Sequence, residues 1–74
     1  MPQLPLVSGQ QVLKVFVNKF GYEIARRKGS HVTIIKKGNP LIITVPLHDQ
    51  LDRGTLRSIL RKADIPVEDF VKEV

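Results

Sequence analysis

Residues 26–31 combine three cations, one glycine and one imidazole within six positions. Arginine and lysine side chains can hold a polyanion, and histidine is the side chain whose ordinary pKa suits proton transfer near neutral pH. Glycine allows the backbone to turn sharply between two strand-like segments. The segment therefore predicts a basic hairpin with one proton-transfer group, although such a hairpin can also be a solvated edge. Its residues are Arg26, Arg27, Lys28, Gly29, Ser30 and His31.

The positive charge of the chain is unevenly distributed. Of the net charge of +5, residues 1–37 carry seven Lys/Arg against Glu23 alone, whereas residues 38–74 carry five Lys/Arg against six Asp/Glu. This asymmetry favours a polyanionic partner on one face, with a surface selected only for solubility as the alternative. The second half still contains one further basic cluster, formed by Arg53, Arg57, Arg61 and Lys62.

The length and composition limit the kind of protein. A chain of 74 residues predicts one domain, residues 1–74, which is too small to enclose a large active-site cavity. The chain has no cysteine, and we expect a soluble cytoplasmic protein without a disulfide or thiolate-metal site. We find no apolar run of membrane-spanning length and no signal peptide, so we expect no membrane association.

The hydrophobic periodicity predicts an α+β fold. Ser8 is a candidate N-cap for a helix over 9–20 that Gly21 ends, and three strands are expected over 22–27, 31–37 and 41–45. These strands would form an antiparallel meander, in the order α-β-β-β-α. Because side chains alternate along a strand, His31, Thr33 and Ile35 should share one face, opposite Val32 and Ile34.

A second helix should begin at Asp52. Leu51 and Leu56 occupy the positions of a hydrophobic staple around this N-cap, and Arg53, Arg57 and Arg61 recur every four residues beside the apolar face. Pro66 can open a short third helix. We therefore expect a three-stranded sheet with helices packed on one face, plus a short C-terminal helix.

Most common enzyme motifs are missing from the sequence. There is no phosphate-binding glycine loop, nucleophile elbow or zinc-ligand spacing. Asp49 and Asp52 with His48 could in principle ligate a cation, but carboxylates near a helix start are usually caps, and His48 has the simpler role of fixing a loop. We expect no metal and no cofactor.

These features fit the cleavage of RNA. If an RNA backbone lies along Arg26, Arg27 and Lys28, a neutral imidazole at His31 could take the proton of the 2′-hydroxyl while the cations stabilise charge on the phosphate. This chemistry needs neither a metal nor a deep pocket. The alternative is a non-catalytic module that binds double-stranded RNA by shape, in which His31 is one more contact.

Three ordered motifs resemble the HicA toxin family, also called YcfA-like. They are Arg27–His31 (RKGSH), Val45–His48 (VPLH) and Gly54–Leu60 (GTLRSIL), and Ser8-Gly9 and Val67–Phe70 (VEDF) also resemble family members. The resemblance implies a double-stranded-RNA-binding-like fold used as a ribonuclease that cleaves mRNA. It also implies a HicB-type antitoxin as the inhibitor, and homo-oligomers formed through the antitoxin complex are compatible with it.

The resemblance assigns the catalytic role to His31. The RNA contacts expected beside it are Arg26, Arg27, Lys28, Ser30, Arg53, Arg57 and Arg61. Two positions depart from the family pattern: many relatives have a second histidine where this chain has Val32, and the usual Ala-Gly after the second helix is Ala63-Asp64.

Overall fold

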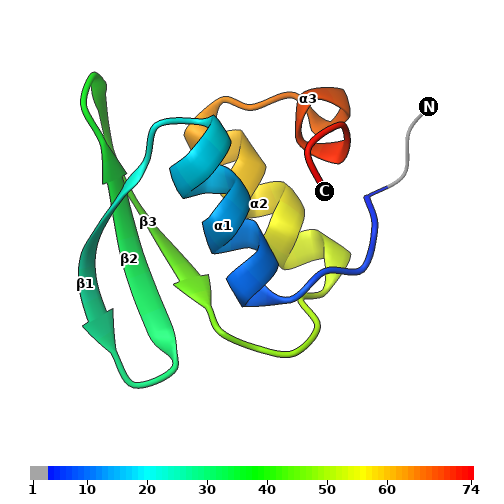
Figure 1. Cartoon of the computed structure of the whole chain (residues 1–74), viewed down its shortest axis with the longest axis horizontal. Helices are drawn as coiled ribbons and strands as arrows, with labels where there is room; N and C mark the ends of the chain where they lie inside the picture. The colour runs from blue at the N-terminus through cyan, green and yellow to red at the C-terminus, as the bar shows by residue number, and fades with distance from the viewer. Residues whose placement is uncertain (1–3) are drawn as a thin grey trace.

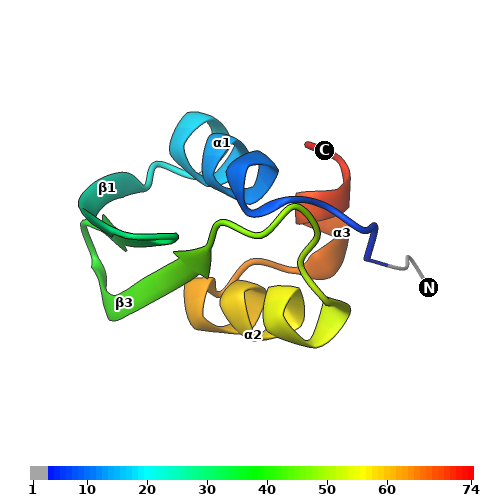
Figure 2. The same ribbon diagram turned by 90° about the horizontal axis from the view of Figure 1, so that it is seen from below.

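The computed structural model describes residues 4–74, in which two long helices cover one face of a three-stranded sheet and a short third helix packs beyond them (Figures 1 and 2). The elements are α1 (Gly9–Lys19), β1 (Glu23–Lys28), β2 (His31–Lys36), β3 (Asn39–Pro46), α2 (Arg53–Ala63) and α3 (Val67–Val71). Figure 2 shows the sheet on one side and the helices on the other. The predicted α-β-β-β-α order and the one-sided packing are confirmed.

Helix α1 begins where the sequence predicts. The Ser8 hydroxyl accepts a hydrogen bond from the Gln11 N–H, and the Gln11 side chain accepts one from the Ser8 N–H, so the two residues form a capping box. The helix ends at Lys19, and Gly21 follows in the left-handed conformation with φ 75°. Its buried face carries Val12, Leu13, Val15 and Phe16.

The strands pair as an antiparallel sheet in the order β1-β2-β3. The third strand was expected from residue 41, but β3 already begins at Asn39, because the turn needs only Lys37 and Gly38, which has φ 95°. Pro40 is tolerated inside β3 because this strand is at the sheet edge, where a missing N–H breaks no ladder. The alternation is confirmed: Val32 and Ile34 are fully buried beneath the helices, as are Ile43 and Val45.

Helix α2 has the predicted cap and staple. The Asp52 carboxylate accepts the Thr55 N–H at 2.6 Å, and Leu51 and Leu56 are both buried. The helix ends at Asp64, which adopts the left-handed conformation (φ 57°) that glycine usually supplies at this position. Aspartate tolerates this region better than most residues, so the substitution for glycine leaves the cap intact.

The aromatic side chains fill the space between the helices. The Phe16 ring lies 5.2 Å from the Tyr22 ring, 5.9 Å from Phe20 and 6.2 Å from Phe70, measured between centroids. Phe16 and Phe70 are fully buried. The cluster joins α1 to α3 and agrees with the expectation that the phenylalanines are core residues.

Candidate nucleic-acid interface

The basic hairpin is held against the loop that follows β3. The Leu47 N–H donates to the Ser30 carbonyl at 2.6 Å, and His31 is the pairing partner of Pro46 across β2 and β3. The two segments RKGSH and VPLH are separated in sequence but form one junction at the end of the sheet. His31 is therefore positioned by backbone hydrogen bonds on two sides.

His31 lies on the face of the sheet that no helix covers. It is exposed, whereas its neighbour Val32 is fully buried on the opposite face. Lys28 pairs with His31 and Arg26 pairs with Thr33, and directly paired residues of antiparallel strands project from the same face. His31, Lys28 and Arg26 therefore share the helix-free face.

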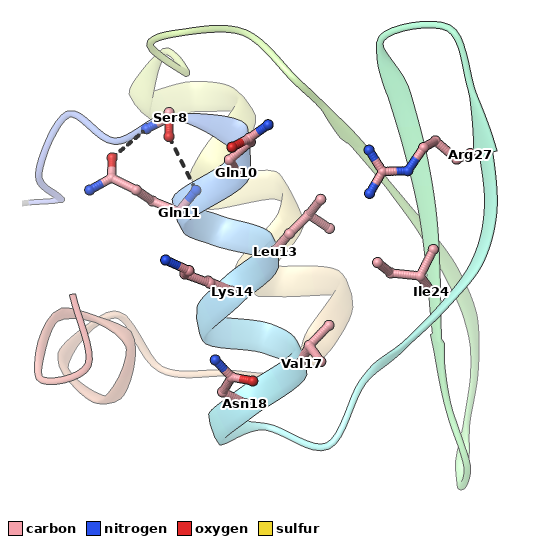
Figure 3. Close-up of a pocket in the computed structure, with 9 residues that line it drawn as sticks. All are labelled: Ser8, Gln10, Gln11, Leu13, Lys14, Val17, Asn18, Ile24 and Arg27. Carbon is pink, nitrogen blue, oxygen red and sulfur yellow. Dashed lines mark hydrogen bonds between the residues drawn. The ribbon is translucent and has the colours of Figure 1, made fainter.

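Arg27 projects in the other direction. It pairs with Val32, on the side of the helices, and Figure 3 shows its guanidinium directed from β1 towards α1. Ile24 pairs with the buried Ile34 and faces the same side. Residues three apart normally face opposite sides of a strand, but the register shift between Ile24 and Arg26 inserts Ala25 as an extra residue. The predicted row of three cations is thus divided between two faces.

A groove of about 460 Å³ separates α1 from β1 (Figure 3). Its floor is apolar, formed by Leu13, Val17 and Ile24. Its rim is polar, and the residues there include Lys14, Asn18 and Arg27. The sequence analysis did not predict this groove, in which Val17 and Ile24 are 38% and 47% exposed.

The start of α1 meets the same junction. A Cβ atom on Gly9 would lie 2.1 Å from the Pro46 carbonyl oxygen and 2.9 Å from the Leu47 Cα, so only glycine fits. The Gly9 N–H donates to the His48 carbonyl at 3.0 Å. The start of α1, the basic hairpin and the loop after β3 therefore gather at one end of the molecule, the lower end in Figure 1. Beyond the Ser8-Gly9 pair itself, nothing in the sequence indicated this contact.

The three arginines of α2 have different surroundings. The Arg53 Nε donates to the Leu4 carbonyl at 2.8 Å, which ties this side chain to the N-terminal arm. Arg57 and Arg61 are exposed. Within residues 4–74 the one ion pair joins Lys19 to Glu73 at 3.8 Å, so Arg57 and Arg61 have no carboxylate partner there.

The acidic loop before α2 has a capping role. The Thr55 backbone N–H donates a hydrogen bond to the Asp52 carboxylate, and this bond is the main reason that the pKa of Asp52 is lowered. The Thr55 side chain, the Gly54 N–H and the charge of His48 lower it further by smaller amounts. In the part of the chain that the structure describes, no three histidine or acidic side chains are grouped closely enough to hold a metal ion. The loop contact of His48 uses its backbone carbonyl, as described above.

Val32 occupies the position at which many relatives have a second histidine. Val32 has no exposed surface and projects beneath the helices, away from His31. On this backbone an imidazole at position 32 would enter the core and would not meet His31 on the helix-free face. The valine instead adds a β-branched side chain to the buried layer.

The chain was compared with known protein families, curated proteins and solved structures. The family model described as the HicA toxin of bacterial toxin-antitoxin systems matches residues 9–65, which include all the segments of the junction. Searches of curated proteins and of solved structures gave no match. No helix within residues 4–74 is long and apolar enough to span a membrane.

Proposed function

The chain belongs to the HicA toxin family of bacterial toxin-antitoxin systems, and from this premise we propose that it is a metal-independent endoribonuclease that cleaves mRNA. The family membership itself gives a toxin role and a partner antitoxin. The nature of the reaction, its residues and its substrate are our inference from the site.

The observation that supports the proposal most strongly is the shared face of His31, Lys28 and Arg26. An exposed imidazole flanked by two cations can bind a phosphodiester and move a proton beside it. The hydrogen bond between Leu47 and Ser30 fixes the start of β2, and it therefore limits the positions that His31 can take.

The reaction we propose uses the RNA's own nucleophile. Neutral His31 accepts the proton of the 2′-hydroxyl, the 2′-oxygen bonds to phosphorus, and the bond from phosphorus to the 5′-oxygen breaks. The leaving oxygen takes a proton from water, and His31 later returns its own proton to solvent. Arg26 and Lys28 stabilise the additional negative charge on the phosphate oxygens. The products are a 2′,3′-cyclic phosphate and a 5′-hydroxyl.

The other cations would bind RNA away from the reacting phosphate. Arg27 and Ser30 lie at the same hairpin, and Arg57 and Arg61 are exposed on α2, so each can contact phosphates without taking part in proton transfer. Arg53 would contribute least, because its guanidinium already bonds the N-terminal arm.

We assign the inhibitory partner to the HicB type. The active face is positively charged and open, so an antitoxin with a complementary acidic surface would bind there and exclude RNA. Such masking would keep a ribonuclease with an exposed catalytic group inactive.

The decisive experiment incubates the purified protein with RNA in the presence of a chelator and identifies the ends of the products. We expect 2′,3′-cyclic phosphate ends from the unsubstituted protein and no cleavage by His31→Ala. Tight binding without cleavage by either protein would instead support a double-stranded-RNA-binding module, which the same fold can provide.

A further inference from the structure

A second groove lies between the β2–β3 turn and the end of α2, remote from His31. Its volume is about 540 Å³. Four cations line it, two from each side: Lys36, Lys37, Arg61 and Lys62. Asp64 is the one carboxylate in the lining. We refer to these four cations as the distal basic cluster.

The side chain of Asn39 connects the two sides of this groove by hydrogen bonds. Its amide nitrogen donates to the Tyr22 hydroxyl at 3.1 Å and to the Lys62 carbonyl at 3.2 Å, while its amide oxygen accepts the Leu41 N–H at 3.0 Å. Tyr22 is almost fully buried, so the turn is anchored to the core. The cations on the two sides are therefore held close to each other by the fold.

The charge of this cluster exceeds what the local structure requires. Arg61 and Lys62 complement the negative end of the α2 dipole, but Lys36 and Lys37 belong to a different element and add like charge beside them. Within residues 4–74 none of the four forms an ion pair. Holding four cations together without carboxylate partners is unfavourable unless an anion binds.

We propose that the distal basic cluster is a second phosphate-binding site, which anchors the substrate RNA at a distance from the cleavage site. The proposal rests on the ribonuclease function proposed above and adds a requirement on substrate length. In this proposal Arg61 binds phosphate together with Lys36, Lys37 and Lys62. It does not form one continuous RNA-binding stripe of α2 with Arg53.

The composition of the groove favours a nucleic acid over a protein. Protein interfaces are depleted of lysine and enriched in aromatic residues at their centres. This groove contains three lysines and no aromatic side chain among its lining residues, and Leu41 is its one large apolar group. A chain of phosphates satisfies such a surface, and the same polyanion is expected at His31.

The distance between the two sites sets the length of RNA. His31 and Lys36 begin and end β2, so they are about 17 Å apart at about 3.3 Å per residue. His31 projects from the helix-free face and Lys36, five residues further along β2, from the side of the helices, so an RNA that contacts both must pass the edge of the sheet and needs more than the about five stacked nucleotides that cover this distance. A trinucleotide has only two internucleotide phosphates and is therefore too short to contact both sites.

The test measures the binding of single-stranded RNA in the His31→Ala background, which prevents cleavage during the measurement. The variants are Lys37→Gln and Arg61→Gln, separately and combined, with Lys37→Arg and Arg61→Lys to restore the charge. Lys36 is left intact because its ammonium lies 5.7 Å from the centre of the Tyr22 ring and supports the fold. Lys72→Gln is the matched control, because Lys72 is an exposed cation at the C-cap of α3 and lines neither groove.

For an RNA of about 20 nucleotides, the double Gln variant should bind about 2- to 30-fold more weakly at low salt than the Lys72→Gln control. The slope of log affinity against log salt should fall by about 0.7 for each cation removed. The loss should be much smaller for a trinucleotide, and the Arg and Lys replacements should restore binding of the long RNA. Thermal unfolding of each variant verifies that the fold is retained.

The proposal of an anchoring site would be overturned if the double Gln variant lost equal affinity for long and short RNA, or lost no more affinity than Lys72→Gln. Loss of antitoxin binding with unchanged RNA affinity would also overturn it and would assign the cluster to the partner. Each of these results leaves the ribonuclease function intact, since that function fails only if the unsubstituted protein does not cut RNA.

Discussion

Arg26 and Arg27 are adjacent in the chain and project from opposite faces of the sheet, Arg26 beside Thr33 and Arg27 beside Val32. Only Arg26 shares the face of His31. Arg27 lines the groove against α1. Substituting each arginine in turn therefore tests two roles separately. Arg26 would contact the reacting phosphate, and Arg27 would bind the RNA elsewhere.

We expect Arg26→Gln to lower the cleavage rate at saturating RNA more than Arg27→Gln does, because Arg26 shares the face of His31, where we propose that the reacting phosphate becomes more negative. Both variants should reduce the slope of log affinity against log salt by roughly 0.7 to 0.9. Single-turnover cleavage and salt-dependent binding measure the two effects. A larger rate effect of Arg27→Gln would indicate that the reacting phosphate binds on the α1 side of the hairpin.

We expect His31→Ala to abolish cleavage without unfolding the protein. Loss of one positioned acid or base typically costs about 10²- to 10⁴-fold in rate, whereas an exposed substitution changes the free energy of unfolding by only about 0.5 kcal/mol. Cleavage assays and urea unfolding of the same preparation test both parts. Unchanged cleavage would make His31 a bystander, and a large loss of stability would give it a structural role.

We expect Gly9→Ala to destabilise the protein by about 1–3 kcal/mol, because the added methyl would overlap the Pro46 carbonyl oxygen. Gly54→Ala is the matched control. A Cβ there approaches only the Asp52 carboxylate oxygen, at 3.5 Å, and alanine favours a helix over glycine by about 1 kcal/mol. Urea unfolding should give opposite signs for the two variants, and equal destabilisation would contradict the close approach at Gly9.

We expect Asp52 to make stability depend on pH in the acid range. The hydrogen bond from Thr55 lowers the pKa of Asp52 below its ordinary value of 3.8, so the folded state binds this proton less readily than the unfolded state. Its contribution is present above the ordinary pKa and is lost as pH falls through the lowered one. Asp52→Asn keeps a capping oxygen but does not titrate. Thermal unfolding between neutral pH and pH 3 should show a shallower acid decline for this variant, and parallel curves would exclude Asp52 as a cause.

We expect co-expression with the product of the adjacent reading frame to yield a complex in which RNA cleavage is inhibited. Charge reversal at Arg26 and Lys28 should weaken that complex, because the proposed partner covers the face of His31 with acidic groups. Lys72→Glu serves as the control on a distant surface. A partner that binds tightly and leaves cleavage unaffected would rule out masking of this face.

The local patterns of the sequence were sufficient to predict the elements and the orientation of β2. Valine, leucine and phenylalanine at helical spacing defined α1, and alternation correctly placed His31 opposite Val32. These features depend on interactions within a few residues of each other. For the same reason the capping residues Ser8 and Asp52 could be identified from the chain alone.

The features that the sequence did not predict depend on contacts between distant segments. The extra residue in β1 arises from its pairing with β2, so the division of Arg26 from Arg27 could not be read from β1 alone. The contact of Gly9 with Pro46 and the hydrogen bonds of Asn39 likewise join segments far apart in sequence. The early start of β3 was missed because Asn39 and Pro40 were assigned to the turn before it.

The extra residue of β1 also bears on how copies of this protein behave at high concentration. β1 is a sheet edge with every residue exposed, and a free edge can pair with the edge of another copy and begin aggregation. The irregular register at Ala25 interrupts the straight row of backbone groups that such pairing needs. The neighbouring Arg26, Arg27 and Lys28 would meet the same cations of the second copy. The strand that carries the proposed RNA contacts is thereby protected from self-association.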